Sequence, residues 1–283
     1  MQNKNIGWQR IILIIIPYFI IVGIFELTGS LLAGIDLTEP NLNNLTSEQH
    51  LTLGLFGFLG TFLLLWIFMK FVDRENFIKL GFQTKNRLKE FNYGIIISAL
   101  IMAIGYLLLL FLNEINFKRI VVNPKEIILS ILVFIIVAVV EEVLFRGYLL
   151  RNLMLSFNKY IALIVSSIIF TLVHAANPNF DLFSFFDLFL GGILLGTSYI
   201  FTKNLWFPIA LHFSWNLFQT LLGFNVSGQD FYSLIEFDIS QNNLLNGGNF
   251  GFEGSIFSII AQIIAIVLIW TYYNQKNDTH TTV

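Results

Sequence analysis

The stretch Ile131-Leu-Val-Phe-Ile-Ile-Val-Ala-Val-Val-Glu-Glu-Val-Leu-Phe-Arg146 places two acids and an arginine directly after ten apolar residues. A helix of this composition is apolar on all sides, which is typical of a membrane span or a protein core. An ionisable side chain near the middle of a span costs about 2.5–3.5 kcal/mol on insertion scales, so it is retained where it has a use. The stretch therefore predicts a membrane-spanning helix that contributes to a polar site.

The composition of the whole chain indicates an integral membrane protein. Of its 283 residues 56% are hydrophobic and 12% are charged, with 31 phenylalanines. Soluble domains carry roughly 25% charged residues. The net charge of −2 offers no basic surface, so nucleic acid is not expected as a partner. Cysteine is absent, which rules out disulfides, thiolate zinc sites and cysteine nucleophiles.

Eight segments are apolar enough and close enough to the required length of about 20 residues to cross a bilayer. They predict an all-α, polytopic bundle of about eight transmembrane helices, forming a single membrane domain over residues 1–283. The segments are 11–33, 51–71, 93–112, 126–150, 160–176, 182–201, 205–224 and 254–273.

The distribution of lysine and arginine between the loops predicts the orientation, because cytoplasmic loops are enriched in both. If the N-terminus is cytoplasmic, only three basic loop residues face outward, namely Lys118, Arg119 and Lys125. Both termini are then cytoplasmic. Abundant Asn, Ile, Lys and Phe are typical of an AT-rich bacterial genome, which favours a bacterial cytoplasmic membrane. The residues then placed inside are Lys4, Arg10, Lys70, Arg74, Lys79, Lys85, Arg87, Lys89, Arg151, Lys159, Lys203 and Lys276.

Helix geometry separates the two acids of the opening stretch. Glu142 and Arg146 are four residues apart and share a helix face, so we expect them to form a structural ion pair. Glu141 is five residues from Arg146 and points about 140° away from it. It is left without a cation, and a carboxylate in that position suits a general base.

Two other predicted spans carry polar residues at a similar depth. His174 lies at the end of 160–176, and His212 and Asn216 share a face of 205–224. At a rise of 1.5 Å per residue, Glu141, His174, His212 and Asn216 fall within a band roughly 10 Å deep. We therefore expect one site. Asp187 and Glu26 lie near outer span ends, where we expect them to reach the interface without a role in the site.

These residues resemble the three motifs of the CPBP intramembrane proteases. The motifs are Glu141-Glu142-x-x-x-Arg146, Phe170-x-x-x-His174 and His212-x-x-x-Asn216, in this order on separate spans. This family includes the CAAX prenyl endopeptidases and the bacteriocin self-immunity (Abi) proteins. The resemblance covers about residues 131–218 and places the catalytic core within 126–224.

The resemblance implies an endopeptidase that hydrolyses a peptide bond of a membrane-associated protein or peptide. Glu141 would be the catalytic carboxylate, His174 would help it to activate water, and His212 with Asn216 would stabilise the oxyanion. We favour a metal-free site without a cofactor. The alternative is a zinc metalloprotease with Glu141, His174 and His212 as ligands, since two histidines and a carboxylate suit zinc.

Two functions outside proteolysis fit part of the same pattern. A proton-coupled transporter would also place ionisable residues at mid-membrane, although no internal repeat is evident. A non-proteolytic scaffold or immunity factor is the other alternative, because a fold does not guarantee an activity.

Overall fold

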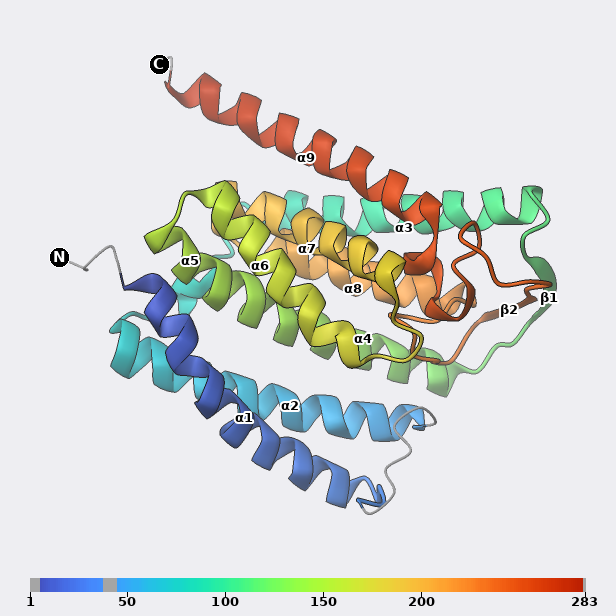
Figure 1. The fold of residues 1–283 in the computed structure, drawn as a ribbon, viewed down its shortest axis with the longest axis horizontal. Helices are drawn as coiled ribbons and strands as arrows, with labels where there is room; N and C mark the ends of the chain where they lie inside the picture. The colour runs from blue at the N-terminus through green and yellow to red at the C-terminus, as the bar shows by residue number, and fades with distance from the viewer. Residues whose placement is uncertain (1–5, 38–44, 282–283) are drawn as a thin grey trace.

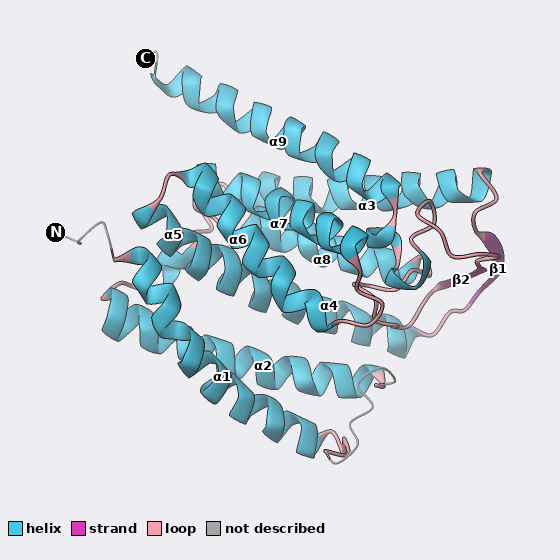
Figure 2. Cartoon of the chain, in the orientation of Figure 1, coloured by secondary structure: helices cyan, strands magenta, loops and turns pink. Residues whose placement is uncertain are grey.

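In a computed structural model that describes residues 6–37 and 45–281, the chain is an all-helical bundle with one small pair of strands (Figures 1 and 2). This confirms the expected fold class. The long helices are α1 (Gly7–Leu32), α2 (Ser47–Ile67), α3 (Leu88–Phe111), α4 (Pro124–Glu142), α6 (Lys159–Val173), α7 (Leu182–Thr202), α8 (Trp206–Leu221) and α9 (Ile256–Thr281). Shorter helical segments are η2 (Phe68–Asp73), η3 (Phe77–Leu80), η4 (Val143–Leu150), α5 (Arg151–Ser156), η5 (His174–Ala176), η6 (Gly248–Phe250) and η7 (Phe252–Gly254).

Polar residues in the connections define where several helices begin. The Asn123 side chain caps α4 by accepting hydrogen bonds from the backbone amides of Lys125 and Glu126. Pro124 occupies the first turn, where its missing N–H is not needed. Asn158 caps α6 in the same way. Asp181 caps α7 through the Ser184 amide. These caps fix where α4, α6 and α7 begin, and the helices run up and down the bundle.

Successive long helices alternate in direction, so that both chain ends lie at the same end of the bundle (Figure 1). The opposite end carries the strands β1 (Asn116–Ile120) and β2 (Ile235–Asp238). An arrangement with both termini on one side agrees with the expected even number of crossings. Lys4, one of the basic residues used to assign the cytoplasmic side, lies outside the described residues.

Among the described residues, seven helices are long and apolar enough to cross a membrane. The predicted segment 205–224 is different, because its helix α8 has only 16 residues. Most of α8 is buried, including Leu211 and Ala210, and it packs against α3 and α4. A helix enclosed by protein does not have to match the thickness of the lipid, which accounts for its short length.

Glycines allow close approach between neighbouring helices at two places. A Cβ added to Gly94 on α3 would lie 2.8 Å from the backbone of α8, at Leu211 N and Phe207 O. Gly192 on α7 faces Ser167 of α6, where an added Cβ would lie 2.8 Å from the serine Cβ. Small residues at such contacts are common in membrane helix packing. They bring α3, α6, α7 and α8 together around the polar residues described below.

The segment between α8 and α9 folds over the end of the bundle (Figure 1). Its strand β2 pairs antiparallel with β1 from the α3–α4 connection. Arg119 Nε lies 2.7 Å from Glu236 Oε2, and Lys118 Nζ lies 3.2 Å from Asp238 Oδ1. The hydrogen bond from Arg119 lowers the pKa of Glu236. This pairing joins two connections that are more than a hundred residues apart in the sequence.

Candidate active site

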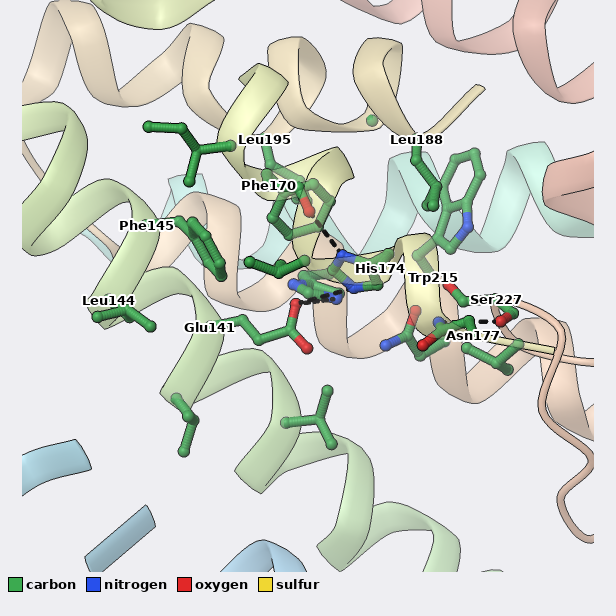
Figure 3. Close-up of a pocket in the computed structure, with 18 of the residues that line it drawn as sticks. Glu141, Leu144, Phe145, Phe170, His174, Asn177, Leu188, Leu195, Trp215 and Ser227 are labelled. Atoms are coloured by element: carbon green, nitrogen blue, oxygen red, sulfur yellow. Dashed lines mark hydrogen bonds and ion pairs between the residues drawn. The ribbon is translucent and has the colours of Figure 1, made fainter. Parts of the chain in front are cut away.

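The side chains predicted to form the site line one cavity of about 760 Å³ inside the bundle. Glu141 projects from the last turn of α4, and His174 begins η5 directly after α6. His212 and Asn216 lie one turn apart on α8. Figure 3 shows Glu141 and His174 facing each other across the cavity. The structure thus brings all four residues from three separate helical segments to the wall of one cavity.

The carboxylate of Glu141 lies between the two histidines. Its Oε2 atom is 3.7 Å from His174 Nε2 and 4.0 Å from His212 Nε2. Both distances exceed a normal hydrogen bond. Glu141 Oε2 also has no hydrogen-bond partner among the described residues. The three polar atoms therefore surround a point at which a water molecule can contact more than one of them.

The orientation of His174 is fixed from within its own helix. His174 Nδ1 lies 2.7 Å from the carbonyl oxygen of Phe170. Because a carbonyl can only accept, Nδ1 carries the proton and Nε2 is directed toward Glu141. The Phe170 ring packs beside the imidazole with 4.6 Å between ring centroids. The motif Phe170-x-x-x-His174 thus supplies both the backbone acceptor and a ring that holds the histidine.

Glu142 connects Arg146 to His212 in a buried chain of charged groups. Glu142 Oε1 lies 2.8 Å from Arg146 Nη1 and 2.8 Å from His212 Nδ1. Arg146 also donates to the carbonyl oxygen of Gly192 at 3.1 Å. The Arg146 guanidinium is 1% exposed and the Glu142 carboxylate 0%. The spacing of four residues predicts the first contact only, since the second joins residues 70 positions apart.

The contact with Glu142 determines how His212 faces the cavity. The carboxylate of Glu142 accepts a hydrogen bond from Nδ1–H of His212, so that Nε2 points to Glu141. A carboxylate at Nδ1 also stabilises the imidazolium form, as it does in catalytic triads. Glu142 therefore orients a histidine of the site in addition to pairing with Arg146.

The helix changes its hydrogen bonding immediately after Glu142. Residues Val143–Leu150 form the π-helix η4, which includes Arg146. Segments of this kind are rare and occur frequently at functional sites. Here the wider turn carries a buried arginine whose guanidinium lies 4.5 Å from the centroid of the Phe170 ring. Nothing in the residue pattern of the sequence indicated this change.

Asp187 does not reach the membrane interface, contrary to the expectation from its place in the sequence. It is 1% exposed and lines the cavity, where its Oδ1 accepts from Gln262 Nε2 at 2.7 Å. The reason is that α9 packs on α7 and covers this turn. Glu26 is exposed, and it also lines the cavity from α1.

Two further polar residues of the cavity escaped the sequence reasoning. Glu253 in η7 accepts from Trp215 Nε1 at 3.1 Å and from the Ser227 amide at 2.7 Å. Gln262, a polar residue within an apolar span, is 1% exposed. The presence of a glutamine in that span was the only signal available before the fold was known.

The described residues contain no group of three or more His, Cys, Asp or Glu side chains placed to hold a metal ion. The set Glu141, His174 and His212 has suitable chemistry, since carboxylate and imidazole both bind zinc. The separations of 3.7 Å and 4.0 Å between Glu141 Oε2 and the two Nε2 atoms are wider than a preformed ligand set requires. Whether hydrolysis needs a metal is tested by chelation of the purified protein.

Fold and site together define an integral membrane protein of the helical-bundle class with a carboxylate between two histidines inside the bundle. Residues 123–218 match the family model described as type II CAAX prenyl endopeptidase Rce1-like. This match confirms the resemblance of the motifs to the CAAX proteases, and it includes Glu141, His174, His212 and Asn216. Neither the curated proteins nor the solved structures contain a significant match.

Proposed function

We propose that this protein is an intramembrane endopeptidase that uses Glu141 and His174 to activate water. The observation that carries the proposal is the position of Glu141 Oε2 between two imidazole nitrogens on the wall of a cavity within the bundle. The family match to a CAAX-type protease over this segment supports hydrolysis as the reaction. A membrane-associated peptide or protein is the substrate class.

In the proposed reaction, one water molecule donates one hydrogen bond to Glu141 and another to His174 Nε2. His174 is suited to accept, because its own proton is engaged at Nδ1 with the Phe170 carbonyl. The water oxygen then attacks the carbonyl carbon of the scissile bond as its proton passes to Glu141. This use of a carboxylate and a histidine on one water is general base catalysis.

Attack on the carbonyl carbon forms a C–O bond and turns the carbonyl oxygen into an oxyanion. We assign stabilisation of this oxyanion to the Asn216 amide and to His212 in its protonated form. Glu142 supports the charge on His212 through the 2.8 Å contact at Nδ1. Glu141 then returns the proton to the leaving nitrogen as the C–N bond breaks, which yields an amine and a carboxylic acid that loses its own proton to water.

The shape of the cavity fits a substrate that is partly embedded in lipid. Apolar side chains of α1, among them Ile15 and Phe19, form one side of the cavity and are also exposed on the outside of the bundle. A substrate entering from the bilayer would meet these residues first. We propose the bacterial cytoplasmic membrane as the location, and no nucleic acid takes part.

The test is a comparison of new peptide termini in membranes that contain the wild-type protein or Glu141→Gln at matched abundance. This substitution keeps the shape of the side chain and removes the base, so termini formed by the wild type should be absent. Glu26→Gln is the matched control, because it removes another carboxylate of the cavity outside the three motifs. Identical termini in all three membranes would exclude proteolysis and favour a binding or transport role.

The role of a metal is tested on the purified protein in lipid vesicles. We propose that hydrolysis is independent of metal, with the protein residues alone moving the protons. If zinc were required, Glu141, His174 and His212 would hold it, and it would supply a polarised water. Cleavage that survives chelator, with no metal detected in the digested protein, supports the proposal. Loss of cleavage that returns with added zinc would replace it with a metalloprotease.

A further inference from the structure

The cavity is strongly acidic for a site inside a membrane protein. Its lining contains four carboxylic acids, Glu26, Glu141, Asp187 and Glu253, and no lysine or arginine among the described residues. None of the four forms an ion pair with lysine or arginine in the described part of the chain. Two of the four, Asp187 and Glu253, are buried, and a buried carboxylate without a counter-charge is costly, so a ligand that brings positive charge to these two would be favoured.

Two acceptor atoms in the wall of the cavity have no hydrogen-bond partner among the described residues, and they mark where such a ligand would bind. Asp187 and Gln262 are each 1% exposed and line the cavity. The amide of Gln262 donates to Asp187 Oδ1 at 2.7 Å and to Ser258 Oγ at 2.9 Å. Asp187 Oδ2 and Gln262 Oε1 have no hydrogen-bond partner among the described residues. Because both atoms can accept hydrogen bonds, a ligand that binds at this part of the cavity would be a donor.

Glu253 adds a second fixed carboxylate to this end of the cavity. It is 7% exposed and held by neutral donors only, the Trp215 ring nitrogen and the Ser227 amide and hydroxyl at 2.9 Å. In Figure 3, Trp215 and Ser227 lie on the far side of His174 from Leu144. These hydrogen bonds fix the position of the charge without neutralising it.

We infer that Asp187, Gln262 and Glu253 form a subsite for a cationic nitrogen of the peptide substrate, a lysine or arginine side chain or a free amino terminus. The inference rests on the proposed peptidase function and adds a preference for basic groups. Asp187 supplies the charge at the position where acceptors are unpaired. Gln262 keeps the Asp187 carboxylate in place and offers a second acceptor.

The position of the subsite sets how far the basic group lies from the scissile bond. Asp187 precedes Gly192, the residue that accepts from Arg146, by five residues, or about 7.5 Å along α7. Trp215, which holds Glu253, lies about one turn from His212 on α8. An extended peptide advances about 3.3 Å per residue. These offsets along α7 and α8 place the basic group a few residues from the bond that is cut, toward the end of the bundle that carries β1 and β2.

The test measures binding on the Glu141→Gln protein, so that cleavage is not needed. The probes are acetylated peptides with an apolar segment of about 20 residues. Each carries one lysine at a different position and has a twin with glutamine there. At one position or two adjacent ones, the lysine peptide should bind roughly tenfold more tightly than its twin. Equal affinities at every position, including no binding of either peptide, would overturn the subsite.

Two further variants assign the preference to Asp187. Adding Asp187→Asn to the Glu141→Gln protein should abolish the preference for lysine, since asparagine keeps the acceptor for Gln262 and loses the charge. Adding Glu26→Gln instead should leave the preference unchanged. A preference that survives Asp187→Asn would contradict the proposal. If Asp187→Asn does not fold, the comparison of lysine and glutamine peptides still decides.

A lysine-free peptide with a free or an acetylated amino terminus separates the two sources of the cation. Tighter binding of the free form assigns the subsite to the amino terminus, and tighter binding of acetylated lysine peptides assigns it to a side chain. Cleavage by the protein with Glu141 intact is measured in parallel. Binding with a lysine preference but without cleavage would reject the proposed peptidase and retain the subsite, whereas cleavage without such a preference would do the reverse.

Discussion

Helices α1 and α8 are both predicted from hydropathy, yet they have opposite surroundings. α1 has 26 residues and exposes large apolar side chains such as Ile16 and Phe19, at 70% and 73%. α8 has 16 residues, and Leu211, Ala210 and Asn216 on it are buried. The lipid-facing helix is long and carries one acid, whereas the enclosed helix is short and carries His212 and Asn216. Length and polarity thus distinguish α8, which is enclosed by protein, from α1, whose apolar side chains are exposed.

The largest expected effect comes from removing Arg146, the cation that helps to hold the enclosed helix α8 against α4. Arg146→Ala leaves Glu142 buried, with His212 of α8 as its remaining partner. Loss of one member of a buried pair costs about 3–5 kcal/mol, so we expect lower accumulation and earlier thermal unfolding in detergent. Arg119→Ala, at the exposed strand pair, is the control and should leave unfolding unchanged. A stable but inactive Arg146→Ala protein would instead assign the arginine to the chemistry.

Asn216→Ala tests whether the polar face of α8 acts in the reaction. If Asn216 donates to the oxyanion, kcat should fall roughly a hundredfold with KM little changed, as for loss of an oxyanion donor elsewhere. Kinetics on a cleaved peptide identified by the terminus comparison would measure this. Substitution of Thr28, an exposed residue of α1, by alanine should have no effect on kcat. A change confined to KM would make Asn216 a binding residue.

Truncation of apolar side chains probes the same contrast without altering charge. Leu211→Ala on α8 should lower the free energy of unfolding by about 2 kcal/mol or more, because Leu211 is 0% exposed and a cavity remains. Phe19→Ala on α1 should have little effect, since lipid or detergent replaces the lost contacts. Denaturation of both variants in the same detergent gives the comparison. Equal losses would show that α1 is packed against protein in the membrane.

The smallest expected effect concerns pH at the strand pair. The pKa of Glu236 is lowered by the hydrogen bond from Arg119, so the carboxylate form is favoured in the folded state. The contribution of this group is complete above its unfolded pKa and is lost as the pH falls through the lower, folded pKa. Amide exchange of β1, normalised for the intrinsic effect of pH, should therefore lose protection in acid below about pH 4. Glu236→Gln should remove that pH dependence, and an unchanged profile would show that the ion pair does not hold the strands.

Hydropathy was sufficient to predict the helical bundle, because lipid requires long apolar helices with internally satisfied backbones. The spacing of Glu142 and Arg146 was readable for the same local reason. The contact between Glu142 and His212 was not, since it depends on how α4 and α8 pack. Burial of Asp187 likewise depends on how α9 packs. The pairing of β1 with β2 depends on a register that neither strand shows alone. The roles of Glu141, His174, His212 and Asn216 stay predictions that the experiments above will decide.

The pairing of β1 with β2 has a consequence for the order in which the chain is assembled. β1 is synthesised before α4, but its partner follows α8, so the two can join only after the four long helices between them, α4, α6, α7 and α8, have been inserted. Ser227 and Glu253, which complete the cavity, flank the late strand. A nascent chain that stops short of α9 has Glu141, His174 and His212 but lacks Gln262, so the wall of the cavity is incomplete. On the proposed function, the site around Glu141 is therefore completed only when the last helix is in place.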